Sequence, residues 1–343
     1  MNKLSDVSTI DRNGILTEIL VYLYEQFSVN PLPSELDGIP EEFDEYIKFV
    51  YDKNKQPFPT IKSRKSLPVI DNVVERDSCL LAFSGGKDST ASALWLKDKG
   101  IKTHLYYVKG INASYPNEEY AAVELAKIMD LPLDIETIRF KGTKDFHESP
   151  VKNHLIMASA VDKYYKQGFA NYSFGVMTNF TVNKTSIDYD LSDCTEFFQL
   201  FANIIRKVYP HFTLRIWWED EGESNAYLNI KHPDIIQHTQ SCMMGLRYRD
   251  SLRKRNEEKC NVKLLPNRCG SCYKDAAEYL TMLYFGNVKP NREYIKHCMH
   301  VLKQTWKNEN PDLLDYTHYS TDKILNESIF KDKLKEYIKK YSD

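Results

Sequence analysis

Short apolar runs alternate with amphipathic stretches of helical period through the middle of the chain, starting at Cys79. The runs predict strands at residues 79–83, 103–108, 133–138, 171–176 and 213–218. The amphipathic stretches predict helices at residues 89–98, 117–129, 151–166 and 193–208. Because this alternation is typical of βαβ units, the pattern predicts an α/β fold with a doubly wound parallel sheet.

Different patterns flank this alternating region. Apolar stripes at helical spacing predict helices at residues 14–27 and 41–51, with prolines between and after them. Further helices are expected near residues 273–285, 291–305 and 322–341. The predicted domains are a helical N-terminal extension (1–75), an α/β domain (76–240), a cysteine-bearing segment (241–285) and C-terminal helices (286–343).

The most informative run, Phe83-Ser84-Gly85-Gly86-Lys87-Asp88-Ser89, follows the first expected strand and opens the first expected helix. A glycine turn at a helix N-terminus holds phosphate well, because backbone N–H groups point outward and glycine lets the ligand approach closely. Hydroxyl donors and a positive charge are added by Ser84, Ser89, Thr90 and Lys87. An ordinary glycine-rich turn is the alternative, but the complete hexapeptide between a strand and a helix favours a phosphate site.

This run is not a Walker A loop, which requires Ser or Thr directly after its Lys, where this chain has Asp88. The string Ser-Gly-Gly-Lys-Asp-Ser instead resembles the PP-loop of the ATP pyrophosphatases. That resemblance implies a fold like that of the adenine nucleotide alpha-hydrolases and cleavage of ATP between its α- and β-phosphates. AMP would be joined to a substrate oxygen, and pyrophosphate would be released.

Composition narrows the class of protein. The net charge of −2 gives no overall basic field, so a nucleic-acid partner is not expected. No apolar run reaches the roughly 18 residues of a membrane-spanning helix, and the polar first residues do not resemble a signal peptide. We therefore expect a cytoplasmic protein with no membrane partner, in which the 7 cysteines are metal ligands or free thiols rather than disulfides.

Four of the cysteines lie close together in the sequence, at Cys242, Cys260, Cys269 and Cys272. The last two form a C-x-x-C pair, and thiolates at such spacing bind structural Zn²⁺ tetrahedrally. We therefore predict a zinc site, with free thiols or a redox pair as the alternatives. The basic residues between Cys242 and Cys260 are interpreted as solvated surface, with contact to phosphate or to an acidic partner as the alternative.

A PP-loop followed by a cysteine cluster resembles the 7-cyano-7-deazaguanine synthases of queuosine biosynthesis, and the similarity covers roughly residues 78–285. Three further stretches resemble that family in the same order: Ser149-Pro150-Val151-Lys152-Asn153, Ser173-Phe174-Gly175-Val176 and Asp193-Cys194-Thr195. The family's last zinc cysteine corresponds to Asp275 here, so either Cys242 or Asp275 would complete the zinc site.

The resemblance implies roles in ATP binding. The loop from Phe83 to Thr90 would hold the pyrophosphate end of ATP, with Lys87 neutralising phosphate charge and Asp88 holding Mg²⁺ or the loop itself. The adenine would contact main chain near Phe83, Tyr107 and Val108.

The resemblance also implies a substrate site. A carboxylate is the fitting acceptor for the N–H donors of a guanine-like base, and Asp193 is the candidate. A helix N-cap is the alternative role for Asp193. Lys152, Asn153 and Gly175 would also bind the substrate, with plain surface exposure as the alternative for Lys152 and Asn153.

The resulting hypothesis is an ATP-dependent carbon–nitrogen ligase. It would adenylate the carboxylate of a 7-carboxy-7-deazaguanine-like molecule, release pyrophosphate and capture the product with an amine. With ammonia as the amine donor the final product would be the nitrile, as in the family. In one alternative the amine belongs to a protein partner, in an antiviral or modification system. In another, the protein is a PP-loop tRNA sulfurtransferase or amidotransferase. We expect a homodimer.

Overall fold

The computed structural model describes residues 14–109, 118–138, 149–175, 195–215, 217–218, 221–240, 246–265 and 267–309. By its contacts the chain divides into two compact units, and each unit is assembled from three separate stretches of sequence. The first unit comprises Met1–Phe83, Ser92–Ala113 and Asp130–Glu219. The second unit comprises Ser84–Ala91, Ser114–Met129 and Asp220–Asp343.

A five-stranded sheet forms the centre of the first unit, and all its neighbouring strands run parallel. The strands are β3 (Glu75–Ala82), β4 (Lys102–Lys109), β5 (Leu133–Thr137), β6 (Phe169–Ser173) and β7 (Thr213–Arg215). Their order across the sheet is β5-β4-β3-β6-β7. The first of these five strands along the chain, β3, is therefore central, and the direction of winding reverses between β3 and β6. The predicted α/β class and the parallel sheet are confirmed.

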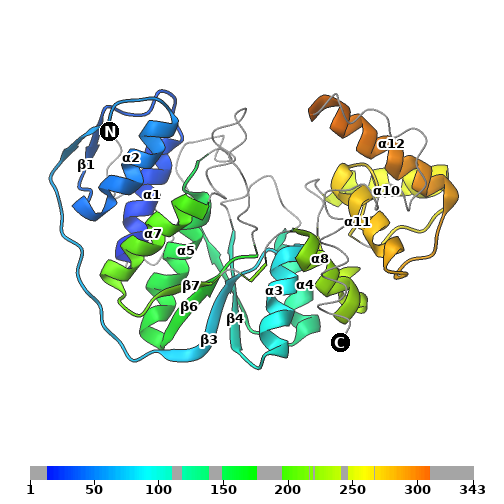
Figure 1. Ribbon diagram of the computed structural model, residues 1–343, viewed down its shortest axis with the longest axis horizontal. Helices are drawn as coiled ribbons and strands as arrows, with labels where there is room; N and C mark the ends of the chain where they lie inside the picture. Colours follow the sequence, from blue (N-terminus) through cyan, green and yellow to red (C-terminus); the bar gives the residue numbers. More distant parts are fainter. Residues whose placement is uncertain are drawn as a thin grey trace. The chain divides into compact units, whose positions relative to one another are not determined.

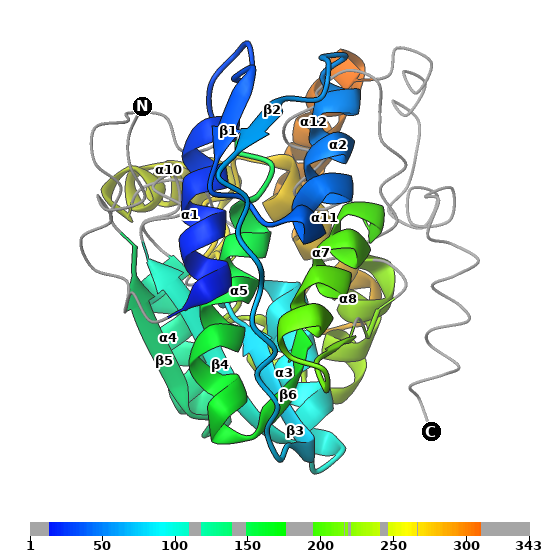
Figure 2. The ribbon, with the colours of Figure 1, turned by 90° about the vertical axis from the view of Figure 1, so that its left-hand side faces the viewer.

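Four helices cover one face of this sheet: α1 (Ile15–Phe27), α2 (Asp44–Lys53), α5 (Lys152–Tyr164) and α7 (Thr195–Val208). They lie on one side of the strands in Figure 1, and Figure 2 shows α1, α5 and α7 from that side, in front of the sheet. Their apolar side chains share one core with Leu80 and Tyr172 of the sheet. The predicted helices at residues 14–27 and 41–51 therefore form, and they belong to the core of the first unit.

The second unit is helical among its described residues. It contains α4 (Glu118–Met129), α8 (Glu221–Lys231), α9 (Pro233–Ile236), α10 (Leu246–Cys260), α11 (Tyr273–Tyr284) and α12 (Arg292–Glu309). It also contains the first turn of α3 (Lys87–Asp98), whose residues from Ser92 belong to the first unit. A small core of Leu264, Leu280, Cys298 and their neighbours holds α10, α11 and α12 together.

The structure differs from the sequence prediction in a few elements. Two short parallel strands, β1 (Glu35–Asp37) and β2 (Thr60–Lys62), lie in the proline-rich stretch that was expected to be loop and linker. The last strand of the sheet ends at Arg215 rather than at residue 218. The reason is that the following tryptophans leave the sheet: Trp217 packs on Trp95, and Trp218 donates a hydrogen bond to Ser92 Oγ at 2.8 Å.

Two further points concern the ends of the prediction. The helix expected at residues 322–341 lies outside the described residues. Within the described ranges, no helix combines the length and the apolar character that crossing a membrane requires.

Candidate nucleotide-binding loop and cysteine cluster

The glycine loop follows the central strand of the sheet. Phe83 is buried, and its N–H donates to Tyr106 O at 2.9 Å, so the main chain keeps its place beside β4 for one residue beyond β3. The loop then runs from Ser84 to Gly86, and α3 begins at Lys87. In doubly wound sheets, ligands bind outside the carboxyl ends of the strands at the point where the winding reverses. Since β3 is the central strand, the order of the sheet makes this loop the leading candidate for a ligand site.

Gly85 has a conformation and surroundings that only glycine suits. Its φ of +73° lies in the left-handed region. A Cβ atom there would also lie 2.7 Å from Ala121 C and from Ala122 N, which are backbone atoms of α4. The loop therefore packs directly against the backbone of α4, which leaves no room for a side chain at residue 85.

Hydrogen bonds order the residues around Gly86. The Thr90 N–H donates to Gly86 O at 3.0 Å and starts α3, while Ser89 Oγ donates to the same oxygen at 3.1 Å. The Gly86 N–H points to Ser84 Oγ at 3.3 Å. Thr90 Oγ1 is buried and has no hydrogen-bond partner among the described residues. Buried hydroxyls are nearly always partnered, so Thr90 is an exception in the first turn of α3.

Asp88 has a partner that sequence reasoning did not predict. Ser224 Oγ, from α8, donates a short hydrogen bond to Asp88 Oδ1. Ser224 and the preceding Glu223 are buried. This contact ties Asp88 to α8, and both roles expected of Asp88, toward Mg²⁺ and in holding the loop, stay predictions. No motif in the sequence links Ser224 to Asp88, because the two residues lie far apart in the chain and α8 is polar.

The carboxyl ends of two neighbouring strands carry other predicted site residues. Leu81 of β3 pairs with Ser173 of β6, so Phe83 and Gly175 each follow the same register position in adjacent parallel strands. Gly175 is buried. In β4, the side chains of Tyr107 and Val108 are buried, and the two residues pair with Ile135 and Glu136 of β5. The main-chain contact expected for adenine stays a prediction.

The remaining predicted substrate residues are only partly described. Lys152 and Asn153 form the first turn of α5, where Lys152 is half-buried and Asn153 is 9% exposed. Both have interaction partners. Asn153 is therefore not the plain surface residue of the alternative interpretation. Asp193 lies outside the described residues.

Two of the predicted zinc ligands adjoin each other in the second unit. A hydrogen bond between Cys269 and Cys272, together with burial, raises the pKa of the Cys272 thiol well above its usual value. The Cys269 and Gly270 N–H groups both donate to Asp275 Oδ2 at 2.8 Å, while Asp275 Oδ1 is buried without a partner among the described residues. The raised pKa favours the protonated form of the Cys272 thiol.

The described residues do not gather a full set of metal ligands around this cysteine pair. Cys260 is buried in the core of α10, α11 and α12, and burial raises the pKa of its thiol. Cys242 lies outside the described residues. Within the described ranges, no three His, Cys, Asp or Glu side chains are gathered as a metal ion requires. The zinc site therefore stays a prediction, and no step of a mechanism is assigned to it.

Comparisons with known proteins add nothing to this description. No model of a known protein family matches the chain, and no curated protein matches it. Any functional inference therefore depends on the motifs of the sequence and on the geometry of the residues themselves.

Proposed function

We propose that this protein is an ATP-dependent ligase that adenylates a carboxylate and captures the activated acyl group with an amine. The observation that carries the proposal is the position of Ser84–Ser89 directly after the central strand β3, where the winding of the sheet reverses. The sequence of the loop supports ATP pyrophosphatase chemistry, as its resemblance implies. The proposed substrate is a carboxylate of the 7-carboxy-7-deazaguanine type.

The chemistry requires charge neutralisation and alignment. A carboxylate attacks the α-phosphorus of ATP through its oxygen, the bond to the β-phosphate bridging oxygen breaks, and pyrophosphate leaves. Pre-oriented N–H donors and cations stabilise the negative charge that develops on the phosphates. In this proposal the amides and hydroxyls of Ser84–Ser89 bind the phosphates, Lys87 offsets their charge, and Ser224 holds Asp88. Mg²⁺ bound to the phosphates would supply further neutralisation.

The second half of the reaction is capture by an amine. The nitrogen attacks the acyl carbon and expels AMP, which leaves an amide. With ammonia, a second activation of that amide and loss of its oxygen with AMP would give the nitrile. If the amine belongs to a protein, the reaction stops at the amide.

The test is product analysis by mass spectrometry. The full-length protein is incubated with Mg-ATP and 7-carboxy-7-deazaguanine, with and without ammonia. We expect AMP and pyrophosphate to form only when the carboxylate is present. Intact ATP under all these conditions would overturn the proposal. Nitrile formation with ammonia would assign ammonia as the acceptor, whereas AMP formation without nitrile would point to a different amine.

A pair of lysine variants makes the test specific to the loop. Lys87→Ala removes the loop cation, and we expect AMP formation to fall by about 10²-fold or more. Lys127→Ala, on the exposed side of α4, is the matched control and should leave the rate unchanged. Equal rates for the two variants would remove Lys87 from the site.

A further inference from the structure

A buried arginine far along the chain is connected to the glycine loop through a short backbone segment. The segment is Thr239–Gln240, which follows α9. The Gln240 N–H donates to Gly85 O at 2.8 Å, and a Cβ atom on Gly86 would lie 3.5 Å from Gln240 O. The segment therefore lies directly against the loop, within the second unit.

Arg268 fixes this segment with two hydrogen bonds. Its Nη1 donates to Thr239 O at 2.7 Å, and its Nη2 donates to Thr239 Oγ1 at 2.9 Å. The guanidinium also pairs with Glu278 of α11. Arg268 is 4% exposed, Thr239 is 0% exposed and Glu278 is 3% exposed. Charged hydrogen bonds that are removed from water are strong, and the planar fork of Arg makes their direction specific.

Two neighbouring side chains support the same segment. Asn267 Nδ2 donates to His238 O at 2.6 Å. Arg249, buried at the start of α10, reaches Gln240 Oε1 and Asn267 Oδ1, each at 3.4 Å. The segment and the preceding His238 are thus held from the cysteine-bearing part of the chain at three successive residues. Arg268 makes the shortest charged contacts in this group.

The bond from Gln240 determines how the loop presents its amides. The C=O of Gly85 and the N–H of Gly86 belong to one planar trans peptide and point in opposite directions. Holding Gly85 O toward Gln240 therefore turns the Gly86 N–H away from Gln240, toward Ser84 Oγ. That amide and that hydroxyl are donors expected to bind phosphate.

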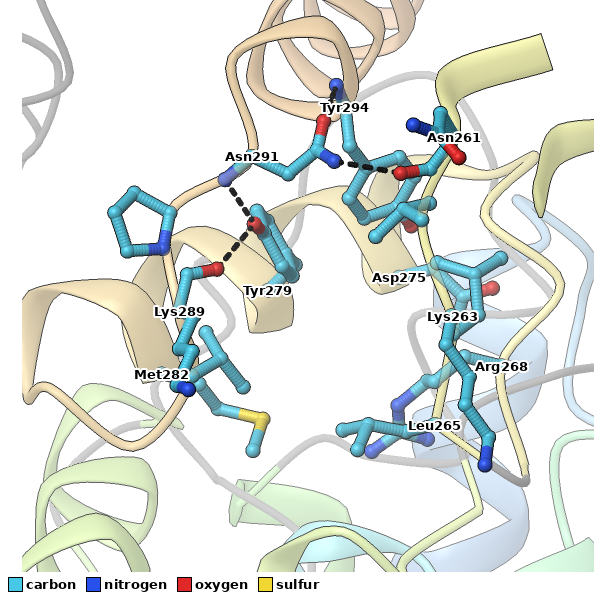
Figure 3. A pocket seen from close by; sticks show the side chains of 14 residues that line it. Asn261, Lys263, Leu265, Arg268, Asp275, Tyr279, Met282, Lys289, Asn291 and Tyr294 are labelled. Carbon is cyan, nitrogen blue, oxygen red and sulfur yellow. Dashed lines mark hydrogen bonds between the residues drawn. The ribbon is translucent and has the colours of Figure 1, made fainter. Parts of the chain in front are cut away.

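We propose that Arg268 is a positioning residue for the nucleotide loop, acting through Thr239 and Gln240 on the peptide between Gly85 and Gly86. This inference rests on the proposed function for the nature of the ligand, which is the phosphate chain of ATP. Arg268 also borders a cavity on the side of α11. This cavity, of about 360 Å³, is also lined by Leu265, Asp275 and Tyr279 (Figure 3).

The test uses Arg268→Lys in the full-length protein. Lysine keeps the charge beside Glu278 but cannot bond both Thr239 acceptors in the fork geometry. We expect the Kd for a non-hydrolysable Mg-ATP analogue, measured by calorimetry, to rise about tenfold. We also expect faster amide hydrogen exchange at Gln240 and in the peptide that contains Gly85 and Gly86. The KM for ATP should rise more than kcat falls.

Lys263→Met is the matched control. Lys263 is an exposed cation that lines the same cavity, and its replacement should change neither the Kd nor the exchange of the loop. If Arg268→Lys does not fold, Thr239→Val keeps the shape of residue 239 and removes its Oγ1, which accepts from Arg268 and donates to Ile236 O at 2.8 Å. This substitution should raise the Kd and the exchange rate in the same direction. Unchanged affinity and unchanged loop exchange in a folded variant would overturn the inference.

The outcomes separate this inference from the proposed function. If the wild-type protein does not bind the ATP analogue but Arg268→Lys still accelerates exchange at Gln240 and the loop, the proposed function fails and the positioning role stands. If the wild-type protein binds the analogue and Arg268→Lys alters neither measurement, the positioning role fails and the proposed function stands.

Discussion

At the scale of single residues, Gly85 is the position that tolerates least change. Its left-handed φ and the 2.7 Å approach of the α4 backbone both exclude a side chain. We expect Gly85→Ala to lower the free energy of unfolding by more than about 2 kcal/mol, from backbone strain and from displacement of the loop. Thermal unfolding measures the loss, and calorimetry measures the accompanying loss of ATP binding.

Gly86→Ala is the control for this prediction. Gly86 is not among the residues with positive φ, and its added Cβ would meet only the movable Ser84 Oγ at 3.3 Å and Gln240 O at 3.5 Å. Its effect on unfolding should be clearly smaller. Two alanine variants of equal stability would contradict the packing of Gly85 against α4.

His154 gives a pH dependence at the same scale. It is fully buried among the rings of Phe197, Phe198 and Phe201, and its Nδ1 is 2.6 Å from Tyr46 Oη. Burial lowers the pKa of His154 to about 3. In the unfolded chain the pKa returns to about 6.5, so below that pH the unfolded state binds a proton that the folded state does not.

The free energy of unfolding should therefore fall as the pH drops below about 6.5, by roughly 1.4 kcal/mol per pH unit from this residue. Denaturation by urea at pH 7, 6, 5 and 4 measures the slope. His154→Leu lowers the stability at pH 7 because Tyr46 loses its partner, but it should flatten the slope. An unchanged slope in the variant would show that other groups cause the pH dependence.

At the scale of elements, the half-buried carboxylate of Asp162 joins α1 to α5. Asp162 Oδ2 accepts hydrogen bonds from Thr17 N at 2.7 Å and from Thr17 Oγ1 at 2.6 Å, while Asp162 Oδ1 accepts from Tyr209 Oη at 2.6 Å. Burial raises the pKa of Asp162, although these hydrogen bonds oppose the rise. The N-terminal helix is thus attached to the α/β core by a polar contact as well as by apolar packing.

Thr17→Val should lower the free energy of unfolding by about 1–3 kcal/mol. The reason is that the hydrogen bond from Thr17 Oγ1 to the Asp162 carboxylate is lost without a change in the shape of the side chain. Thr17→Ser keeps the hydroxyl and is the control. Thermal unfolding compares the two variants. A Val variant as stable as the wild type, with the Ser variant the less stable of the two, would mean that the methyl group, rather than the hydrogen bond, matters at this position.

The sequence predicts elements well where burial imposes a period. The strands of the sheet and helices such as α1 and α7 follow from the spacing of apolar residues. Each helix buries one stripe of apolar side chains, and strands such as β3 and β4 bury a continuous apolar run. Helix α10 was not predicted, because it carries Arg, Lys and Glu on most of its surface and lacks such a stripe. Strands β1 and β2 are too short and too polar to leave a pattern.

The candidate nucleotide site could likewise be predicted from the sequence only in part. The loop from Phe83 to Ser89 is recognisable because its residues are consecutive and form a motif between a strand and a helix. Ser224, Gln240 and Arg268 are not recognisable, because they reach the loop only through the tertiary fold. A buried polar residue without a local motif is indistinguishable in sequence from a surface residue.

At the scale of the whole molecule, the N-terminal helices belong to the same core as the sheet. Leu20 and Tyr24 of α1 and Ile47 of α2 are fully buried, and they share the core with Leu155 and Phe201. We expect removal of residues 1–53 to abolish cooperative thermal unfolding and to cause aggregation, since it exposes a large apolar surface.

Val29→Ala, in the same segment but at a side chain 51% exposed, should leave the melting temperature unchanged. Circular dichroism and light scattering follow both proteins. A truncated chain that melts cooperatively at the wild-type temperature would show that residues 1–53 fold as an independent addition.

The order of residues in the second unit determines when the glycine loop can form during synthesis. Its glycine loop is ordered by α4, by the Thr239–Gln240 segment and, through that segment, by Arg268. Ribosomes deliver the chain from its N-terminus, so the loop emerges long before the residues that shape it. Under the proposed function, a nascent or prematurely ended chain carries the nucleotide motif in an unformed state. Under the same proposal, synthesis past Arg268 is the step that first permits ATP to be used.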